Sequence, residues 1–423
     1  MKTLFFIYSY FIAPLLYFGM KVLSLFDSKI KDGIKGRKKI IENLILILSS
    51  QKQKKKAICF HASSMGEFEQ AKPIIEELKS SKKDYLIAAT FFSPSGYKNN
   101  RNYTYIDIIS YIPFDMPRQT NLFVRTLNPD VFIFMRYDIW PNLILALKKN
   151  KSKIFLVDAT MKSTSRRFRP IVKQFHKFIF SQFDKILTIS EEDKNNFLKF
   201  GIDKHKLHVV GDTRFDRVYK KSLSAKEIRL FNESIFKDKL TIVAGSLWEE
   251  DENILLPVIV KLFKYNSNLL FILVPHEPTE RNLENLERKI PTNLRHIRFS
   301  QMINYTNENI IIIDSIGILL TLYKYANIAF VGGGFKYNVH NVLEPAAYGL
   351  PVIYGPKIKK SQEAEKLASL GGGFIAANQK ELYKTLKKLI DNEDFRKRAS
   401  EISRSLVVNN IGATQKIIKL LEL

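Results

Sequence analysis

Short apolar runs alternate with longer amphipathic stretches through the first half of the chain. The apolar runs predict buried strands at 57–61, 85–90, 130–135, 153–157, 185–189 and 207–210. The amphipathic stretches between them predict helices at 67–79, 142–149 and 191–200. Strands that alternate with helices in this way are typical of a doubly wound parallel sheet covered on both faces.

The same alternation starts again in the second half. Its apolar runs predict strands at 240–244, 269–274, 310–313, 328–331, 351–354 and 373–377. Helices are expected at 315–325 and 363–369, and a last helix at 414–421 is expected to cross back to the first half. Between the two series, residues 219–239 lose the apolar period and become rich in Lys, Ser and Asn, which indicates a link between domains.

The beginning of the chain has a different pattern, because residues 3–20 carry no charge. At about 1.5 Å per residue, such a helix reaches roughly 27 Å, close to the thickness of a bilayer core. Many basic residues follow it, which by the positive-inside rule places the remaining chain in the cytoplasm. A membrane-surface or core-docking helix is one alternative. A cleaved signal peptide is another, although no small-residue cleavage site follows the apolar run.

These patterns together predict an α/β protein of the GT-B class, in which two Rossmann-like doubly wound domains face a central cleft, with an N-terminal membrane anchor. The expected parts are the anchor at 1–26, an acceptor-binding domain at 27–218, the link at 219–239, a donor-binding domain at 240–405 and the C-terminal helix at 406–423. A length of 423 residues suits two domains.

The net charge of the chain indicates which classes of binding partner it attracts. The formal net charge of +25 attracts nucleic acid, acidic phospholipids or a phosphorylated or carboxylated substrate. Aromatic residues do not interleave with the basic runs as a stacking surface for single-stranded nucleic acid requires, so no nucleic-acid partner is expected. The single cysteine, Cys59, lies in an apolar run and is expected to be a buried strand residue.

Ligands of open α/β sheets bind at the carboxyl ends of strands, and the polar motifs of this chain lie there. Residues 61–67 read His-Ala-Ser-Ser-Met-Gly-Glu, and Glu67 at the start of a helix could act as the base for an attacking hydroxyl. The alternative is that Glu67 only stabilises the helix N-terminus. Arg101, after the motif at 90–96, could help bind an anion, with a plain turn as the alternative. Asp138, in the motif at 136–142, could lie in a loop that contacts an acceptor or could only cap a helix. The basic cluster at 162–169 could bind lipid headgroups or substrate phosphates, or could be a solvated basic face.

The motifs of the second half indicate a ligand site more strongly than those of the first half. Ser246 and His276 follow strands, and a glycine triplet at 332–334 is followed by His-Asn-Val-Leu-Glu-Pro at 340–345. Glycines let the backbone approach a phosphate closely, and a helix that starts near Asn341 would point its positive end to the same place. In this interpretation Glu344 binds the ribose hydroxyls of a nucleotide.

The ordered set of motifs resembles the 3-deoxy-D-manno-octulosonic acid (Kdo) transferase family of lipopolysaccharide biosynthesis. The set comprises residues 61–67, 139–142, 211–216, 244–246, 314–317 and 332–344. The resemblance implies transfer of Kdo from CMP-Kdo to a lipid A precursor at the cytoplasmic face of the inner membrane, where anionic lipids are further partners. It implies no cofactor and no metal.

The resemblance also implies a role for each motif residue that matches. Glu67 would be the catalytic base, and Arg101 and Asp138 would lie near the acceptor. The donor side would use Ser246, His276, Gly333, Gly334, Asn341 and Glu344. Two departures stand out: Arg136 occupies a position that is acidic in many members, and the glycine loop is shorter and less polar than usual.

Two other functions stay open at this point. One is a GT-B glycosyltransferase or epimerase that uses another nucleotide sugar, since the fold alone does not decide the donor. The other is a membrane-tethered binder of nucleotides or nucleic acid without enzymatic activity.

Overall fold

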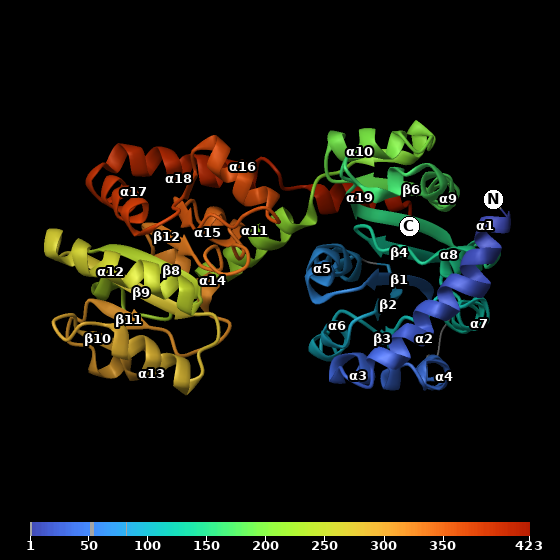
Figure 1. Ribbon diagram of the computed structural model, residues 1–423, viewed down its shortest axis with the longest axis horizontal. Coiled ribbons are helices and arrows are strands. Elements are labelled where there is room, and N and C mark those ends of the chain that lie inside the picture. The colour runs from blue at the N-terminus through green and yellow to red at the C-terminus, as the bar shows by residue number, and fades with distance from the viewer. Residues whose placement is uncertain (1, 51–54, 82) are drawn as a thin grey trace. The chain divides into compact units, whose positions relative to one another are not determined.

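The computed structural model describes residues 2–50, 55–81 and 83–423. Met1 of the expected anchor, and residues 51–54 and 82 of the expected first domain, lie outside the described residues. The chain forms two compact units, Met1–Arg217 with Ile411–Leu423 and Val218–Asn410 (Figure 1). Each unit has its own parallel sheet and its own core.

The first unit is built on a seven-stranded parallel sheet in the order β3-β2-β1-β4-β5-β6-β7. Its strands are β1 Lys56–Ala62, β2 Tyr85–Phe91, β3 Ile108–Tyr111, β4 Val131–Met135, β5 Lys153–Ala159, β6 Lys185–Thr188 and β7 Leu207–Val209. They read as apolar runs because helices cover both faces of the sheet. The strand order reverses between β1 and β4, and this switch point is where open sheets bind ligands at their carboxyl ends.

The helices of the first unit pack around this sheet. They are α1 Lys2–Ile7, α2 Ala13–Leu23, α3 Ser28–Gly36, α4 Ile40–Ser49, α5 Met65–Ser80, α6 Pro94–Asn99, α7 Pro117–Leu127, α8 Pro141–Lys149, α9 Pro170–Ser181, α10 Glu191–Leu198 and α19 Ala413–Leu421. A π-helical turn, Tyr8–Ile12, joins α1 to α2. The last helix, α19, packs on α5, and its Ile417 and Leu421 are fully buried there.

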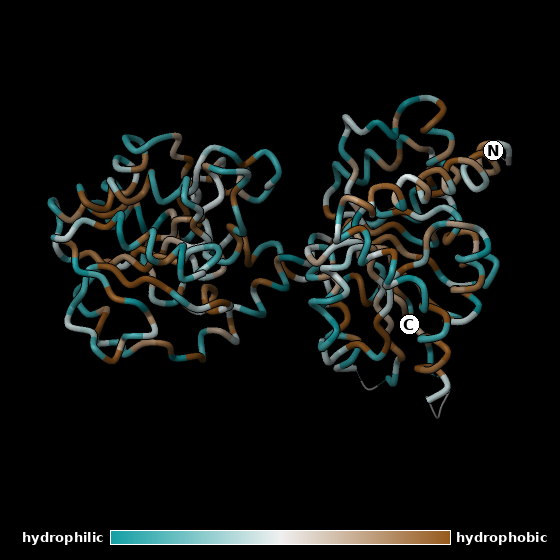
Figure 2. Tube along the Cα trace, turned by 60° about the horizontal axis from the view of Figure 1, so that its bottom comes forward, coloured by the Kyte–Doolittle hydropathy of each residue, from teal (hydrophilic) through white to brown (hydrophobic). Residues whose placement is uncertain are grey.

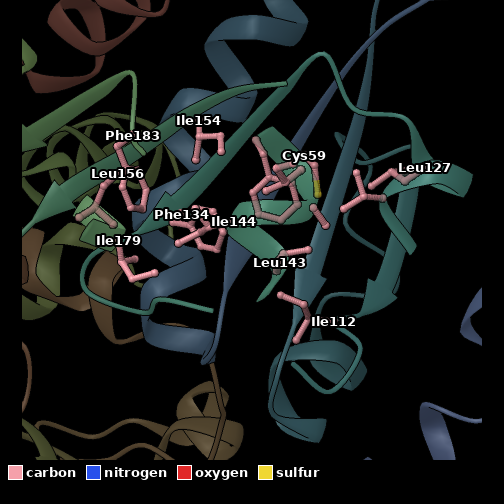
Figure 3. Packing of buried hydrophobic residues seen from close by; sticks show 14 of the residues in the cluster. Cys59, Ile112, Leu127, Phe134, Leu143, Ile144, Ile154, Leu156, Ile179 and Phe183 are labelled. Carbon is pink, nitrogen blue, oxygen red and sulfur yellow. The ribbon is translucent and has the colours of Figure 1, made fainter. Parts of the chain in front are cut away.

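Part of the core of the first unit lies between the sheet and the helices on one of its faces. Figure 3 shows Cys59 of β1 and Phe134 of β4 close to Leu143 and Ile144 of α8. Cys59 is completely buried, as expected, and burial raises the pKa of its thiol.

The second unit repeats this architecture in the order β10-β11-β9-β8-β12-β13-β14. Its strands are β8 Leu240–Leu247, β9 Leu269–Pro275, β10 His296–Arg298, β11 Ile310–Ile312, β12 Ile328–Val331, β13 Val352–Tyr354 and β14 Gly373–Ile375. Its helices are α12 Glu249–Tyr265, α13 Glu280–Lys289, α14 Leu319–Leu322, α15 Leu343–Ala347, α16 Gln362–Leu370, α17 Gln379–Asp391 and α18 Glu393–Val408. Two doubly wound parallel sheets are therefore confirmed.

The segments between the expected elements differ from the sequence prediction in two places. Residues 219–239 are structured within the second unit, because α11, Thr213–Lys226, runs across the boundary between the units and Phe231 is buried. The helix expected at 315–325 is reduced to α14 and a 3₁₀ turn, Tyr323–Tyr325. Gly317 has a φ of +88°, a left-handed conformation that interrupts a regular helix.

The N-terminal segment is helical, as its composition predicts. Thr3–Leu23 is long and apolar enough to cross a membrane, and no other helix in the described ranges meets that test. Figure 2 shows apolar residues in brown both in the interior strands and in the segment that follows the N-terminus.

Candidate active site

His61, near the end of β1, lies at the centre of a polar group at the switch point of the first sheet. Its ring is fully buried, and Nδ1 lies 3.0 Å from Thr90 Oγ1 and 3.2 Å from the Thr90 carbonyl oxygen. Trp140 Nε1 donates a hydrogen bond of 2.9 Å to His61 Nε2. Because an indole N–H can only donate, Nε2 carries the lone pair and the proton of a neutral His61 is on Nδ1.

Glu67 is in the first turn of α5, next to this group. Ser64 is the N-cap of α5, and its hydroxyl accepts from the Glu67 amide at 3.3 Å. The Glu67 carboxylate reaches back and accepts from the Ser63 amide at 2.7 Å. Burial raises the pKa of Glu67, and the nearby Asp138 carboxylate raises it further, whereas the hydrogen bond from Ser63 opposes the shift. Glu67 therefore stabilises the helix start and also has the raised pKa that suits a general base.

Asp138 follows β4 and joins the same group. Its Oδ2 lies 3.3 Å from His61 Nε2. Arg136, two residues earlier, has a left-handed φ of +63°, and its Nε is buried with no hydrogen-bond partner in the part of the chain that the structure describes. Arg167, from the basic cluster at 162–169, donates to the Tyr137 carbonyl at 3.1 Å. The loop after β4 thus supplies the Asp138 carboxylate and the Arg136 guanidinium, and Arg167 reaches this loop from the 3₁₀ turn Arg166–Phe168 after β5.

A second polar cluster, which the sequence analysis did not identify, lies at the end of β5. Asp158 is fully buried, has a φ of +51° and accepts hydrogen bonds from the amide and hydroxyl of Thr213. Burial raises the pKa of Asp158 to about 8. Asp212, in the motif at 211–216, pairs with Arg214 at 2.6 Å. Asp212 and Thr213 belong to the motif at 211–216, whereas the only signal for Asp158 was its position directly after an apolar run.

Arg101 is not joined to this group. Its guanidinium lies over the Tyr97 ring at 5.8 Å, and within the described residues it has no hydrogen bond or ion pair with His61, Glu67 or Asp138. Its role near an acceptor stays a prediction.

The glycine loop after β12 is packed tightly against its own unit. A Cβ at Gly332 would lie 2.3 Å from the Ser246 carbonyl oxygen, and one at Gly334 would lie 2.6 Å from the Gly355 amide nitrogen. Ser246 and Gly333 have left-handed φ values of +55° and +86°. The glycines are needed because backbone meets backbone here, and any side chain would force the loop open.

Asp251, in the first turn of α12, accepts hydrogen bonds from amides of this loop. Its carboxylate accepts from Gly333 N at 2.7 Å, Trp248 N at 3.0 Å and Phe335 N at 3.3 Å. The Gly333 amide was expected to be available to a phosphate, but here it donates to Asp251. Binding of an anion by that amide would require exchange of this hydrogen bond.

Three rings form a stacked cluster beside the glycine loop. The His276 ring stacks on Trp248 at 4.4 Å and on His340 at 4.5 Å between centroids. Trp248 Nε1 donates to His340 Nε2 at 2.9 Å, so His340 is neutral in this arrangement. Burial, together with the neighbouring His276, lowers the pKa of His340 to about 4. Lys336 Nζ lies 4.1 Å from the centre of the Trp248 ring and adds a positive charge.

Asn341 and Glu344 lie at the start of α15. Asn341 Oδ1 accepts from Leu343 N at 3.1 Å, and its amide donates to Glu344 Oε1 at 3.0 Å. The helix begins at Leu343 instead of Asn341, with Val342 as its N-cap, and Asn341 precedes it in the loop. The loop returns to the glycines through His340 N, which donates to Gly332 O at 3.0 Å. Five of the six expected donor residues therefore come from strand ends or from this one loop, and Glu344 is bonded to it.

The described residues contain no group of three or more His, Cys, Asp and Glu side chains arranged to hold a metal ion. Sequence reasoning missed Trp248 and Asp251, although both lie in the segment that directly follows Ser246. Trp248 is one of only two tryptophans in the chain, which was the available signal.

Comparison with known proteins shows similarity to 3-deoxy-D-manno-octulosonic acid transferases. Residues 38–217 match the family model described as 3-deoxy-D-manno-octulosonic-acid transferase (kdotransferase). A 3-deoxy-D-manno-octulosonic acid transferase of Aquifex aeolicus is 32% identical over 349 residues, which is 81% of this chain and 88% of that protein. A protein of the same name from Chlamydophila psittaci is 29% identical over 346 residues, 80% of this chain and 78% of that protein.

Solved structures match at the level of the fold. The UDP-GlcNAc 2-epimerase of Neisseria meningitidis superimposes with a TM-score of 0.61 and 16% identity, covering 87% of this chain and 100% of that chain. Together with the two parallel sheets, this match shows the GT-B fold.

Proposed function

Since the chain belongs to the Kdo transferase family and is a glycosyltransferase, we propose that it transfers Kdo from CMP-Kdo to a lipid A precursor with inversion at the anomeric carbon. The observation that carries the chemistry is the buried Glu67 with its raised pKa, at the switch point of the first sheet. Lipopolysaccharide biosynthesis is the pathway to which this reaction belongs.

In the proposed step, a hydroxyl oxygen of the acceptor attacks the anomeric carbon of Kdo. The bond from that carbon to the phosphate oxygen breaks, CMP leaves, and Glu67 takes the proton of the attacking hydroxyl. One carboxylate base is sufficient for inversion. Ser63 holds the Glu67 carboxylate by a hydrogen bond of 2.7 Å, which fixes its direction before the acceptor binds.

We assign the acceptor to the first unit. Arg167 interacts electrostatically with Asp138, and the buried Nε of Arg136 has no hydrogen-bond partner among the described residues. Guanidinium groups bind phosphate through paired hydrogen bonds, so they suit a phosphorylated lipid. Asp138, which touches His61, is proposed to hold an acceptor hydroxyl near Glu67.

We assign CMP-Kdo to the second unit. The proposed contacts are Ser246, the loop of Gly333 and Gly334, and Asn341 and Glu344 for the ribose; a contact through the Gly333 amide requires that amide to leave Asp251. His276 and Lys336 face the same cluster and would interact with the negative charges of phosphate and carboxylate. No cofactor and no metal is required in this scheme. Catalysis requires the two units to bring donor and acceptor together during turnover.

The proposed location is the cytoplasmic face of the inner membrane. Support comes from the apolar helix Thr3–Leu23, the basic residues that follow it and the net charge of +25. Basic residues near an anionic leaflet contribute about 1 kcal/mol each to binding. Anionic phospholipids are therefore proposed partners, and nucleic acid is not.

The test is a donor panel with the purified full-length protein. Release of CMP from CMP-Kdo is expected only when a lipid A precursor is present, with a gain of one or more Kdo masses on the lipid. UDP-N-acetylglucosamine, tested in parallel, is expected to stay unchanged. Turnover of the UDP-sugar, or no mass gain with CMP-Kdo, would reject the proposal.

A further inference from the structure

The N-terminal helix lies along the surface of the first unit, and the residues that face the unit recur every four positions. Phe5, Ser9, Ala13 and Tyr17 lie on one face of the helix, as this spacing requires. Ser9 and Ala13 are buried, with 2% and 7% of their surface exposed. The Phe5 ring lies 6.4 Å from Phe178, and the Tyr17 ring lies 4.6 Å from Phe114. The helix is therefore in contact with the unit over most of its length.

Two hydrogen bonds within this contact are specific. Tyr8 Oη donates to Asp115 Oδ2 at 2.7 Å, and Ser9 Oγ donates to Asn142 Oδ1 at 2.7 Å. The Asp115 carboxylate also accepts from the amides of Asn142 and Leu143, so it caps α8. If the helix left the unit to cross a bilayer, these buried groups would lose their partners, and two hydroxyls would enter lipid.

The opposite face of the helix is apolar and exposed from end to end. Its side chains are Phe6, Ile7, Tyr10, Phe11, Ile12, Leu15, Leu16, Phe18, Val22 and Leu23, and Leu25 and Phe26 follow in the turn after the helix, each of them at least 40% exposed. The exposed Ile45 and Leu46 of α4 extend the apolar surface of this unit. An apolar patch of this size marks a site that another phase or molecule covers.

We propose that residues 3–26 lie in the plane of one leaflet instead of spanning the bilayer, with the inward face docked on the first unit and the outward face in the acyl region. Such helices enter to roughly 5–10 Å below the headgroups. A spanning helix surrounded by lipid cannot keep contacts from Phe5 to Tyr17 with a unit that stays in water. The in-plane arrangement keeps every contact and also buries the apolar face.

The charges beside the helix match the anionic surface of a phospholipid leaflet. Lys21 lies in the last turn of α2, and α3 with its flanks carries Lys29, Lys31, Lys35, Lys38 and Lys39. A pocket of 540 Å³ opens between α2, α4 and α7, lined by apolar side chains and by Lys21, Arg37 and Lys38. Amines next to apolar walls suit a lipid phosphate and its chain, so the occupant of this face is phospholipid.

Depth measurement with spin labels tests the proposal. Native Cys59 is fully buried, so a cysteine placed at Phe6, Leu16 or Leu25 is the only thiol open to labelling. Each full-length variant is bound to vesicles of phosphatidylethanolamine with a minority of phosphatidylglycerol. Collision of the label with oxygen and with a water-soluble nickel chelate then gives its depth. Lys264→Cys, on the exposed surface of α12, is the aqueous reference.

The in-plane arrangement predicts one shallow depth, about 5–10 Å, for Phe6→Cys, Leu16→Cys and Leu25→Cys. A spanning helix predicts a gradient instead, with Leu16→Cys near the bilayer centre, about 15 Å deep, and Phe6→Cys near the far headgroups. That gradient would overturn the proposal, as would labels that stay in water at all three positions.

Docking is tested with a matched pair of variants in the same vesicles. Tyr8→Phe removes the hydrogen bond to Asp115 and is expected to lower the melting temperature by about 2–4 °C. Tyr10→Phe, on the outward face, is expected to leave it unchanged. Equal melting temperatures for both variants would mean that the helix is undocked in the membrane. Neither measurement requires sugar transfer, so this inference and the proposed function can fail separately.

Discussion

Glu67 illustrates how one residue can serve both the fold and the proposed reaction. Its carboxylate completes the cap of α5 through Ser63, and burial beside Asp138 holds its pKa above the ordinary range. A residue that only capped a helix would gain most from being fully ionised and exposed. The buried position instead costs stability when the group is charged, which is the pattern expected at a functional site.

Glu67→Gln is expected to lower turnover by about 10²–10⁴-fold while donor binding is kept, because Gln cannot accept the proton. The thermal stability of Glu67→Gln, unlike its turnover, is not expected to fall. A raised pKa in the folded state favours the protonated form, so stability is lost as pH rises through that pKa, and the neutral Gln removes this loss. The variant is thus expected to melt at or above the wild-type temperature at neutral pH. Glu77→Gln, on the same helix, is the control for both the turnover and the melting measurement. Full activity in Glu67→Gln would exclude Glu67 as the base.

His340 gives a second prediction, on pH. Its pKa of about 4 lies below the ordinary value of 6.5, so its contribution to stability is complete above pH 6.5 and is lost as pH falls towards 4. The melting temperature is expected to fall over this window. In His340→Gln the fall should be smaller, because Gln can still accept from Trp248 but does not titrate. His205→Gln, at an exposed site, should melt like the wild type; an equal fall in all three proteins would contradict the assignment.

Among the elements, the C-terminal helix is held at its start by three hydrogen bonds to one carboxylate. Asp216 in α11 accepts from Gly412 N at 2.5 Å and from both the amide and the hydroxyl of Thr414 at 2.7 Å. These bonds fix the start of α19, which fills the core beside α5 with Ile417 and Leu421. A motif residue of the sequence analysis, at 211–216, therefore has a structural task that spacing alone did not reveal.

Asp216→Ala is expected to destabilise the first unit by about 1–2 kcal/mol, because the cap of α19 is lost. Thermal unfolding should show a decrease of a few degrees. Asp394→Ala, at an exposed position in the first turn of α18, serves as the comparison and is expected to stay close to the wild type. Identical melting of the two variants would mean that α19 does not depend on this cap.

The sequence predicted the strands that form clear apolar runs and missed β3 and β10. The strand β10 reads His-Ile-Arg, so it has no apolar run to recognise. Site positions at strand ends were also predictable, because the topology of parallel sheets requires them there. The contacts between side chains could not be predicted. Trp140 meets His61 because β1 and β4 are neighbours in the sheet. Asp251 binds the Gly333 amide across the left-handed turn at Ser246.

For the whole molecule, the net charge of +25 and the apolar N-terminal face would give two separable contributions to the membrane binding proposed above. The electrostatic contribution is screened by salt within a Debye length of about 10 Å at 0.1 M. The apolar contribution is not screened. A protein held only by charge would detach completely at high salt.

Binding to anionic vesicles is therefore expected to weaken as salt is added but to persist at a plateau. Leu15→Asp together with Leu16→Asp should remove the plateau, because both side chains are exposed on the outward face, and should leave the salt-sensitive part. Replacement of Ile303, which is 95% exposed in the second unit, by Asp is the control. Sedimentation of vesicles over a salt series measures both parts, and an unchanged plateau in the double variant would show that another surface inserts.

Both tryptophans of the chain donate their indole N–H to Nε2 of a histidine, Trp140 to His61 in the first unit and Trp248 to His340 in the second. Emission excited selectively from indole consequently arises from two places, one in each proposed binding region. With Trp140→Phe the remaining signal reports on the donor side, and with Trp248→Phe it reports on the acceptor side. The native chain thus contains a pair of optical probes that can follow the order in which the two substrates arrive.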